Sequence, residues 1–273
     1  MGLFGPKKSP DQLMHQAISM ARQNQPKKAA SLFAEVLRQE PENAEALYGR
    51  GLALNRIKKY ADAITCFDAL LHAKPDDAPA LNNKGIALAE LGNIQDAADC
   101  YTRAIEADPK YAASYFNNGV LLDKLRDHEG ALEMLEKAIA ADPKKPNGLF
   151  YKGIVLGKLK RHEDALACFT KVYKKHPQHH DALFQKGIQL GEIGRHKEAL
   201  NVFDAVNPAY RDNVNMLYAV SRSLAALGRY PEAMGFLKRA FGKNPKMVRQ
   251  WAREEKAFTV LHNDPKFRAM AKI

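Results

Sequence analysis

A 34-residue period constrains the fold of this chain more than any other feature of its sequence. Prolines recur in one frame of that period, at Pro41, Pro75, Pro109, Pro143, Pro177 and Pro245. A fixed period of this length is the signature of a repeat architecture, in which each unit buries its apolar face against its neighbours. We number the positions of each unit as columns 1–34, with these prolines at column 32.

The other columns repeat in the same frame. The units begin at Pro10, Ala44, Ala78, Ala112, Pro146, His180 and Val214. Column 20 is alanine in every unit: Ala29, Ala63, Ala97, Ala131, Ala165, Ala199 and Ala233. Columns 4, 8 and 11 share one helix face and columns 20, 24 and 27 share another, so each unit is predicted to be a helix–turn–helix.

Two kinds of residue mark the ends of these helices. Column 15 holds Asn24, Gly92, Gly194 and Gly228 in four units, which favours a left-handed residue after the first helix. Proline at column 32 disfavours helical conformation in the residue before it and so ends the second helix.

This pattern resembles the tetratricopeptide repeat family, and the resemblance covers residues 10–247. It implies an all-α fold, a right-handed superhelical α-solenoid whose first helices line the concave face. We expect a flexible N-terminus at 1–9, seven repeats and a C-terminal capping segment at 248–273 that includes a capping helix. The repeats are residues 10–43, 44–77, 78–111, 112–145, 146–179, 180–213 and 214–247.

Two segments are expected to depart from the regular pattern. The sixth unit has Pro208 at column 29 and Arg211 at column 32, which predicts an early end to its second helix and an irregular connection over 207–213. Beyond the seventh unit, Val248–Lys256 is expected to be helical and to cover the last apolar face.

No motif in the sequence indicates catalysis, a cofactor or a metal. Walker, GxGxxG, HExxH and GxSxG elements are absent, so we expect no enzyme activity. Cys66, Cys100 and Cys168 share column 23, so they lie whole repeats apart and are predicted to be buried free thiols. A cluster of histidines at 176–180 is interrupted by Pro177, which splays the turn, so no metal is expected there.

The family resemblance implies that columns 2, 5, 6, 9, 12 and 13 face the concave groove. On that basis a peptide or amphipathic helix of a partner protein is expected to bind here, which makes the chain an adaptor or scaffold. The candidate contacts are Tyr48, Asn82, Asn83, Phe116, Asn117, Val120, Lys124, Phe150, Tyr151, Ile154, Lys158, Phe184, Gln185, Ile188, Tyr218 and Arg222.

The centre of this predicted groove combines aromatic and basic residues. Phe116, Phe150 and Phe184 form a column of rings, and Lys124 and Lys158 stand at one rim. An apolar trough with a basic edge suits a segment that carries acidic residues. The alternative is that the rings pack against the next helix and are structural.

Net charge differs between the halves of the chain. Residues 1–143 hold 17 Lys and Arg against 20 Asp and Glu, whereas residues 144–273 hold 25 against 11. A second hypothesis is therefore binding of a polyanion, nucleic acid or an anionic membrane, through the basic half. Its contacts would be Lys144, Lys145, Lys158, Lys160, Arg161, Lys174 and Lys175. No nucleic-acid module accompanies them, and surface lysines also serve solubility.

The first ten residues suggest a compartment and a third hypothesis. They lack the apolar run of a signal peptide, and Pro6 breaks the myristoylation pattern, so we expect a cytoplasmic protein. Leu3 and Phe4 could dock into the groove of a second copy and build head-to-tail assemblies. Otherwise the chain is expected to be a monomer or to associate weakly.

Overall fold

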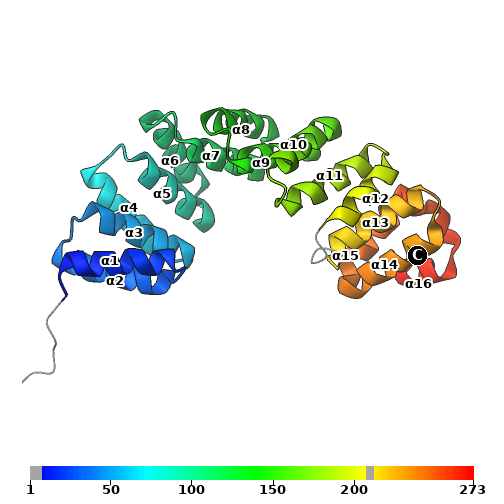
Figure 1. The fold of residues 1–273 in the computed structure, drawn as a ribbon, viewed down its shortest axis with the longest axis horizontal. Helices are drawn as coiled ribbons and strands as arrows, with labels where there is room; N and C mark the ends of the chain where they lie inside the picture. Colours follow the sequence, from blue (N-terminus) through cyan, green and yellow to red (C-terminus); the bar gives the residue numbers. More distant parts are fainter. Residues whose placement is uncertain (1–7, 207–211) are drawn as a thin grey trace, which may run out of the picture. The chain divides into compact units, whose positions relative to one another are not determined.

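The computed structural model describes residues 8–206 and 212–273, and it is built from helices that pair in sequence order (Figure 1). Contacts between Cα atoms divide the chain into two compact units, Met1–Lys144 and Lys145–Ile273. The boundary lies at the junction of the fourth and fifth repeats. We refer to these as the first and second units.

The first unit consists of four helix pairs, in which each first helix packs against the second helix of its own repeat. Its helices are α1 (Pro10–Arg22), α2 (Pro26–Gln39), α3 (Ala44–Arg56), α4 (Tyr60–Ala73), α5 (Ala78–Leu91), α6 (Ile94–Ala107), α7 (Ala112–Lys124) and α8 (His128–Ala141).

The second unit consists of three such pairs and a C-terminal segment. Its elements are α9 (Pro146–Lys158), α10 (His162–Lys175), α11 (His180–Glu192), α12 (His196–Ala205), α13 (Val214–Ala226), α14 (Tyr230–Lys243), α15 (Pro245–Glu254), the 3₁₀ helix η2 (Lys256–Asn263) and α16 (Pro265–Ala271).

The helix starts follow the predicted period. Every first helix begins at column 1 of its unit, from Pro10 to Val214. The four residues predicted to be left-handed have φ between 57° and 86°. Lys58, Arg126 and Lys160 occupy column 15 in the other three units and are left-handed as well. The backbone of this turn is therefore set by the hairpin rather than by glycine.

Small residues let the two helices of a repeat approach closely. All seven column-20 alanines are fully buried. A Cβ added at Gly51 would lie 2.6 Å from the ring of Phe67, so only glycine fits against that ring. Cys66, Cys100 and Cys168 are buried, as predicted, and burial raises the pKa of each thiol. Such thiols behave as small apolar side chains.

The sixth repeat departs from the pattern as predicted. Its second helix, α12, has 10 residues, whereas the other second helices have 14. The connection expected to be irregular, 207–213, includes residues 207–211, which lie outside the described part of the chain, as do residues 1–7 of the expected N-terminal segment.

The prediction for the C-terminal helix was wrong at both ends. Helix α15 starts three residues earlier than expected, because the Asn244 side chain accepts a hydrogen bond from Met247 N (3.1 Å) and Pro245 occupies the first turn. It ends at Glu254, since Glu255 is extended and caps η2.

The C-terminal segment covers the apolar face of the last repeat. Phe258 and Phe267 are fully buried and belong to one core cluster with Leu217, Leu237 and Phe241. Two α-helices, α15 and α16, and the 3₁₀ helix η2 between them form this segment.

Candidate functional site

A cavity of about 470 Å³ opens in the second unit between α11, α13 and the C-terminal segment. We call it the second-unit cavity. It is lined by Phe184, Gln185, Ile188, Asn215, Tyr218, Ala219, Arg222, Trp251, Glu254 and Glu255.

Half of these residues were predicted as groove contacts. Phe184, Gln185 and Ile188 come from α11, and Tyr218 and Arg222 come from the next first helix, α13. Their columns, 5, 6 and 9, bring them together because they share the same face of successive helices.

The other half was missed. Asn215 and Ala219 lie at columns 2 and 6, which the same rule assigns to the groove. Trp251, Glu254 and Glu255 come from the segment that was interpreted only as a cap. If the period is continued past residue 247, these three residues fall at columns 4, 7 and 8, which the same rule does not assign to the groove, so column position gives no signal for them.

Aromatic rings form one wall of the second-unit cavity. The rings of Tyr218 and Trp251 lie 5.0 Å apart between centroids, and Tyr218 also meets Phe258 edge to face at 5.9 Å. Burial, reinforced by Glu255, raises the pKa of the Tyr218 hydroxyl well above its usual value. The hydroxyl is therefore protonated at neutral pH and can donate a hydrogen bond.

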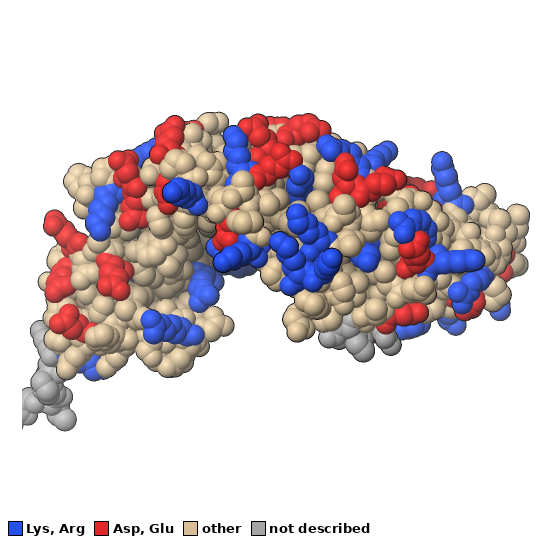
Figure 2. All heavy atoms as spheres, turned by 45° about the horizontal axis from the view of Figure 1, so that its top comes forward, with Lys and Arg blue, Asp and Glu red and all other residues tan. Residues whose placement is uncertain are grey.

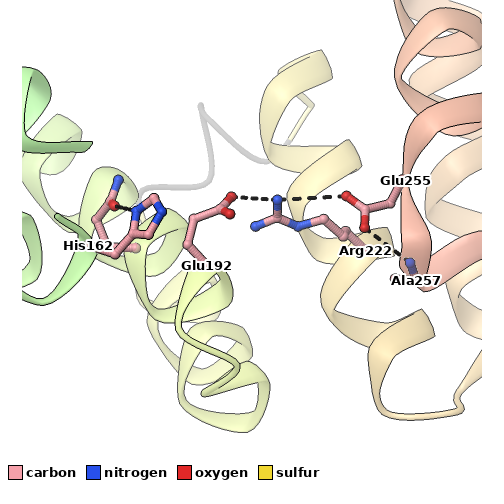
Figure 3. A network of polar contacts seen from close by, with 6 residues as sticks. His162, Glu192, Arg222, Glu255 and Ala257 are labelled. Carbon is pink, nitrogen blue, oxygen red and sulfur yellow. Dashed lines mark hydrogen bonds and ion pairs between the residues drawn. The ribbon is translucent and has the colours of Figure 1, made fainter. Parts of the chain in front are cut away.

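A polar network that includes two cavity-lining residues, Arg222 and Glu255, is drawn in Figure 3. Arg222 Nη1 lies 2.6 Å from Glu192 Oε1 and 3.8 Å from Glu255 Oε2. Glu255 Oε1 accepts a hydrogen bond from the backbone N–H of Ala257 at 3.1 Å. The Arg222 guanidinium thus links α11 to the start of η2.

The charge balance around this network is acidic. Glu192 and Glu255 both pair with the Arg222 guanidinium, and Glu254 also lines the second-unit cavity. The side chains of Arg222 and Glu255 are 18% and 21% exposed, so water screens their pairing only in part. The second-unit cavity therefore offers aromatic surface, one paired cation and an excess of carboxylate.

Histidines beside the network differ in their partners. His162 Nδ1 lies 2.9 Å from Oε1 of the buried Gln189 (Figure 3). The Gln189 amide packs closely against Gly157, where an added Cβ would lie 3.2 Å from Gln189 Nε2. His196 Nδ1 is buried with no hydrogen-bond partner among the described residues. Burial and the nearby Arg222 charge lower the pKa of His196.

The remaining predicted residues of the second unit do not line this cavity. Phe150, Tyr151 and Ile154 are half-buried, and Lys158 is exposed. The Phe150 ring packs edge to face on Phe169 at 5.5 Å and lies 4.7 Å from the His179 ring. Phe184 similarly lies 6.0 Å from Phe203. Phe150 and Phe184 thus each contact a buried phenylalanine of the second helix of their own repeat.

The predicted residues of the first unit fall into a hydrogen-bonded asparagine group and a rim. Asn117 Nδ2 donates to Asn82 Oδ1 at 2.8 Å, and Asn83 Nδ2 donates to the Tyr48 hydroxyl at 3.3 Å. Asn82 is only 3% exposed, so it presents almost no surface to a partner. Burial raises the pKa of Tyr48 to about 12.

The other first-unit candidates are partly exposed. Phe116 and Val120 are half-buried, and Lys124 is exposed and forms an ion pair with Glu90 at 3.7 Å.

A second cavity, of about 650 Å³, lies between α1, α2, α3 and α5, and we call it the first-unit cavity. Of the predicted contacts in the first unit, Asn83 lines it. Phe116 belongs to the first unit and Phe150 and Phe184 to the second, so the predicted column of rings is divided between them.

The described residues provide neither a cluster of metal ligands nor a membrane-spanning helix. Within residues 8–206 and 212–273, no group of three or more His, Cys, Asp or Glu side chains could hold a metal ion. None of the helices described combines the length and the apolar character needed to cross a membrane.

Similar folds occur among solved structures. YrrB, described as a tetratricopeptide repeat protein with an unusual peptide-binding site, is 24% identical, with a TM-score of 0.59 over 69% of this chain and 97% of YrrB. MamA from Desulfovibrio magneticus RS-1, from residue 41 onward, is also 24% identical, with a TM-score of 0.54 over 64% of this chain and 99% of that one. A tetratricopeptide repeat protein from Parabacteroides merdae is 15% identical, with a TM-score of 0.63 over 96% and 97%.

No curated protein sequence matches the chain. The family model described as Tetratricopeptide repeat matches residues 16–78, 82–146, 152–212 and 184–247. These matches cover most of the sequence, and the solved structures above share the fold. The chain belongs to the tetratricopeptide repeat family.

Proposed function

We propose that this protein is a non-catalytic adaptor that binds a peptide or an amphipathic helix of a partner protein in the groove formed by its first helices. The family's fold is a scaffold for protein–protein interaction. Our finer proposal is that the second-unit cavity is the principal contact.

One observation carries this proposal. Five residues chosen from column positions alone, Phe184, Gln185, Ile188, Tyr218 and Arg222, line a single cavity. Trp251 extends its aromatic surface, and aromatic residues in partly enclosed pockets dominate binding energy in many interfaces. The preformed wall lowers the cost of ordering the receptor on binding.

The experiment compares baits that differ at matched positions. Phe184→Ala with Ile188→Ala removes two side chains that line the second-unit cavity. Val202→Ala is the control, because Val202 packs against the same core residues as Phe184 and Ile188 but lines a different surface hollow. We expect a partner retained by wild type and Val202→Ala to be lost from the double variant, with thermal unfolding used to show that all baits are folded. A partner captured equally by all three would contradict the proposal.

The polyanion hypothesis is weakened by the charges around one of its contacts. Arg161, a predicted phosphate contact, pairs with Asp164 at 2.9 Å, and Arg195 and Arg229 repeat the arrangement with Glu198 and Glu232. On the face shown in Figure 2, Asp and Glu side chains stand among the Lys and Arg side chains over parts of the surface, while elsewhere Lys and Arg side chains gather together. Nucleic acid or lipid recovered with every bait and released by salt would favour this hypothesis instead.

The self-assembly hypothesis rests on Leu3 and Phe4, which lie outside the described residues. Deleting residues 1–9 and measuring the mass by light scattering tests it, because only an assembly held by that segment would dissociate.

A further inference from the structure

The first-unit cavity has a different character from the second-unit cavity. Its floor is aliphatic and aromatic, and its rim holds two arginines and two asparagines. The floor is formed by Ile18, Ala21, Phe33, Leu52, Ala53 and Ile86. Ile18, Leu52 and Ile86 all occupy column 9, so one aliphatic side chain from each of three successive first helices contributes to it.

The two arginines of the rim have no carboxylate partner in the described part of the chain. Arg22 and Arg56 are exposed at column 13, in the last turns of α1 and α3. Two other residues at column 13 do form ion pairs: Glu90 Oε1 lies 3.7 Å from Lys124 Nζ, and Glu192 Oε1 lies 2.6 Å from Arg222 Nη1. The rim of the first-unit cavity therefore departs from a pairing that is made elsewhere in the array.

Glu90 occupies column 13 in the repeat after the one that contains Arg56, and its carboxylate already has partners. Its carboxylate accepts from the Tyr60 hydroxyl at 3.4 Å and pairs with Lys124. The carbonyl ends of α1 and α3 stabilise a cation in the last turn, which accounts for a positive charge there. Stabilisation by the helix ends does not explain why the two arginines stand beside an open apolar cavity. It also leaves their hydrogen-bond donors available to a ligand.

Asn55 supplies a second, independent observation. Its Nδ2 donates to the backbone carbonyl of Asn83 at 3.0 Å, which fixes the orientation of the amide because a carbonyl can only accept. Its Oδ1 is buried in the wall of the first-unit cavity with no donor among the described residues. An unpaired buried acceptor is unfavourable, and a ligand N–H in the cavity would satisfy it.

We propose that the first-unit cavity binds an extended peptide segment of a partner protein that combines large aliphatic and acidic side chains. The aliphatic side chain would lie on the column-9 floor, the carboxylate would pair with Arg22 and Arg56, and a main-chain N–H would donate to Asn55 Oδ1. This site belongs to the first unit and does not depend on the second-unit cavity. A fatty acid matches the floor and the arginines, but it has no N–H for Asn55.

The test uses the full chain and a short acetylated probe peptide of alternating Glu and Leu with a fluorescent label, followed by anisotropy. Comparison peptides replace Glu by Gln or Leu by Ala. We expect saturable binding that weakens about tenfold or more when Glu is replaced, since each arginine–carboxylate hydrogen bond is charge-assisted. Replacing Leu by Ala should weaken binding to a similar degree.

Matched protein variants locate the site. The double substitution Arg22→Gln and Arg56→Gln should weaken binding about tenfold or more. Lys27→Gln with Lys28→Gln removes two exposed cations of the same unit that do not line the first-unit cavity, and should leave binding within about twofold. Because all four side chains are exposed, these changes are expected to leave the fold intact.

The chain's single tryptophan separates the two sites. Trp251 lines the second-unit cavity, so binding in the first-unit cavity should leave its emission unchanged. Decanoate competing with the peptide would identify the shared carboxylate chemistry, and we expect it to compete weakly. Absence of saturable binding, equal affinity for the Arg22/Arg56 variant, or displacement of the peptide by decanoate at equal concentration would overturn the proposal.

Discussion

Left-handed residues close every helix hairpin of the array, and three of them are long cationic side chains: Lys58, Arg126 and Lys160. A left-handed conformation costs a non-glycine residue about 1–2 kcal/mol, and glycine's extra freedom in the unfolded chain costs about 0.5–1 kcal/mol. We therefore expect each of Lys58→Gly, Arg126→Gly and Lys160→Gly to raise the free energy of unfolding by about 0.5–1 kcal/mol. Chemical denaturation measures this effect.

The reverse substitution is the control. Gly92 has φ 86°, and no atom would lie within 4 Å of a Cβ added there. Gly92→Ala should therefore destabilise by about 1 kcal/mol through backbone strain alone. A stabilising effect of Gly92→Ala would contradict this account of the turn.

The network around Arg222 makes a second prediction at the scale of residues. Arg222→Met would leave Glu192 and Glu255 as unpaired like charges in a partly buried place, so unfolding should become easier by about 1–3 kcal/mol. Arg195→Met removes a pair of the same length, 2.6 Å, whose side chains are 49% and 55% exposed. That control should cost under about 1 kcal/mol.

His196 predicts a pH dependence. Burial and Arg222 lower its pKa in the folded state, with Glu255 and Glu192 acting in the opposite direction. The unfolded state therefore binds the proton more readily, and stability present above about pH 6.5 is lost as the pH falls below that value. His196→Tyr introduces the residue that Tyr230 provides at the same column.

Thermal unfolding of both proteins between about pH 7 and pH 5 tests this prediction. The stability of wild type should fall more steeply than that of His196→Tyr. Equal slopes would show that His196 does not contribute to the loss of stability.

At the scale of elements, the C-terminal segment closes the core of the second unit. Phe267 of α16 is fully buried against Phe258, at 5.9 Å between ring centroids. Phe267→Ala should destabilise by about 3–5 kcal/mol, because a large cavity is left in a closed core. Met270→Ala truncates a partly buried side chain of the same helix and should cost clearly less. Equal losses for the two variants in chemical denaturation would contradict the closing role of Phe267.

The repeat helices could be predicted from the sequence because one constraint recurs in every unit. Alanine at column 20 and the proline at column 32 fix the period, and the first helices begin where that period places them. Pro208 likewise predicted the early end of α12. The C-terminal segment has no second copy for comparison, and Pro245, assigned to the end of a unit, instead begins a helix.

The candidate site could be predicted only in part, for a reason of the same kind. Column positions identify which face a side chain occupies, so Phe184, Tyr218 and Arg222 were found. Column positions do not tell how deeply each side chain is buried. Asn82, which was predicted as a contact, is almost inaccessible. Nor do they reveal that Lys124 is paired with Glu90, or that Trp251 completes an aromatic wall.

At the scale of the whole molecule, charge separates the two ends of the sequence. Residues 1–143 carry a net charge of −3 and residues 144–273 carry +14. Despite this, the second-unit cavity has an acidic excess, and the first-unit cavity has two arginines without a carboxylate partner among residues 8–206 and 212–273. The net charge of each half therefore does not describe the local charge of the cavity in that half.

This separation yields a prediction about the basic half. Replacing Lys174 and Lys175 by Glu changes the net charge by −4 and lies outside the second-unit cavity. Partner capture at physiological salt should be unchanged, because the proposed contacts are local. Loss of the partner in a pull-down with this variant would favour the polyanion hypothesis.

The central claim is that a partner segment occupies the second-unit cavity, and site-specific photo-crosslinking tests it most directly. Asn215 is exposed and lines that cavity, while Asn201 is exposed and lines a different surface hollow of the same unit. With a photo-reactive residue at each position in turn, a specific partner peptide should crosslink at 215 and not at 201. Crosslinking of the same peptide at both positions, or at 201 alone, would contradict the account.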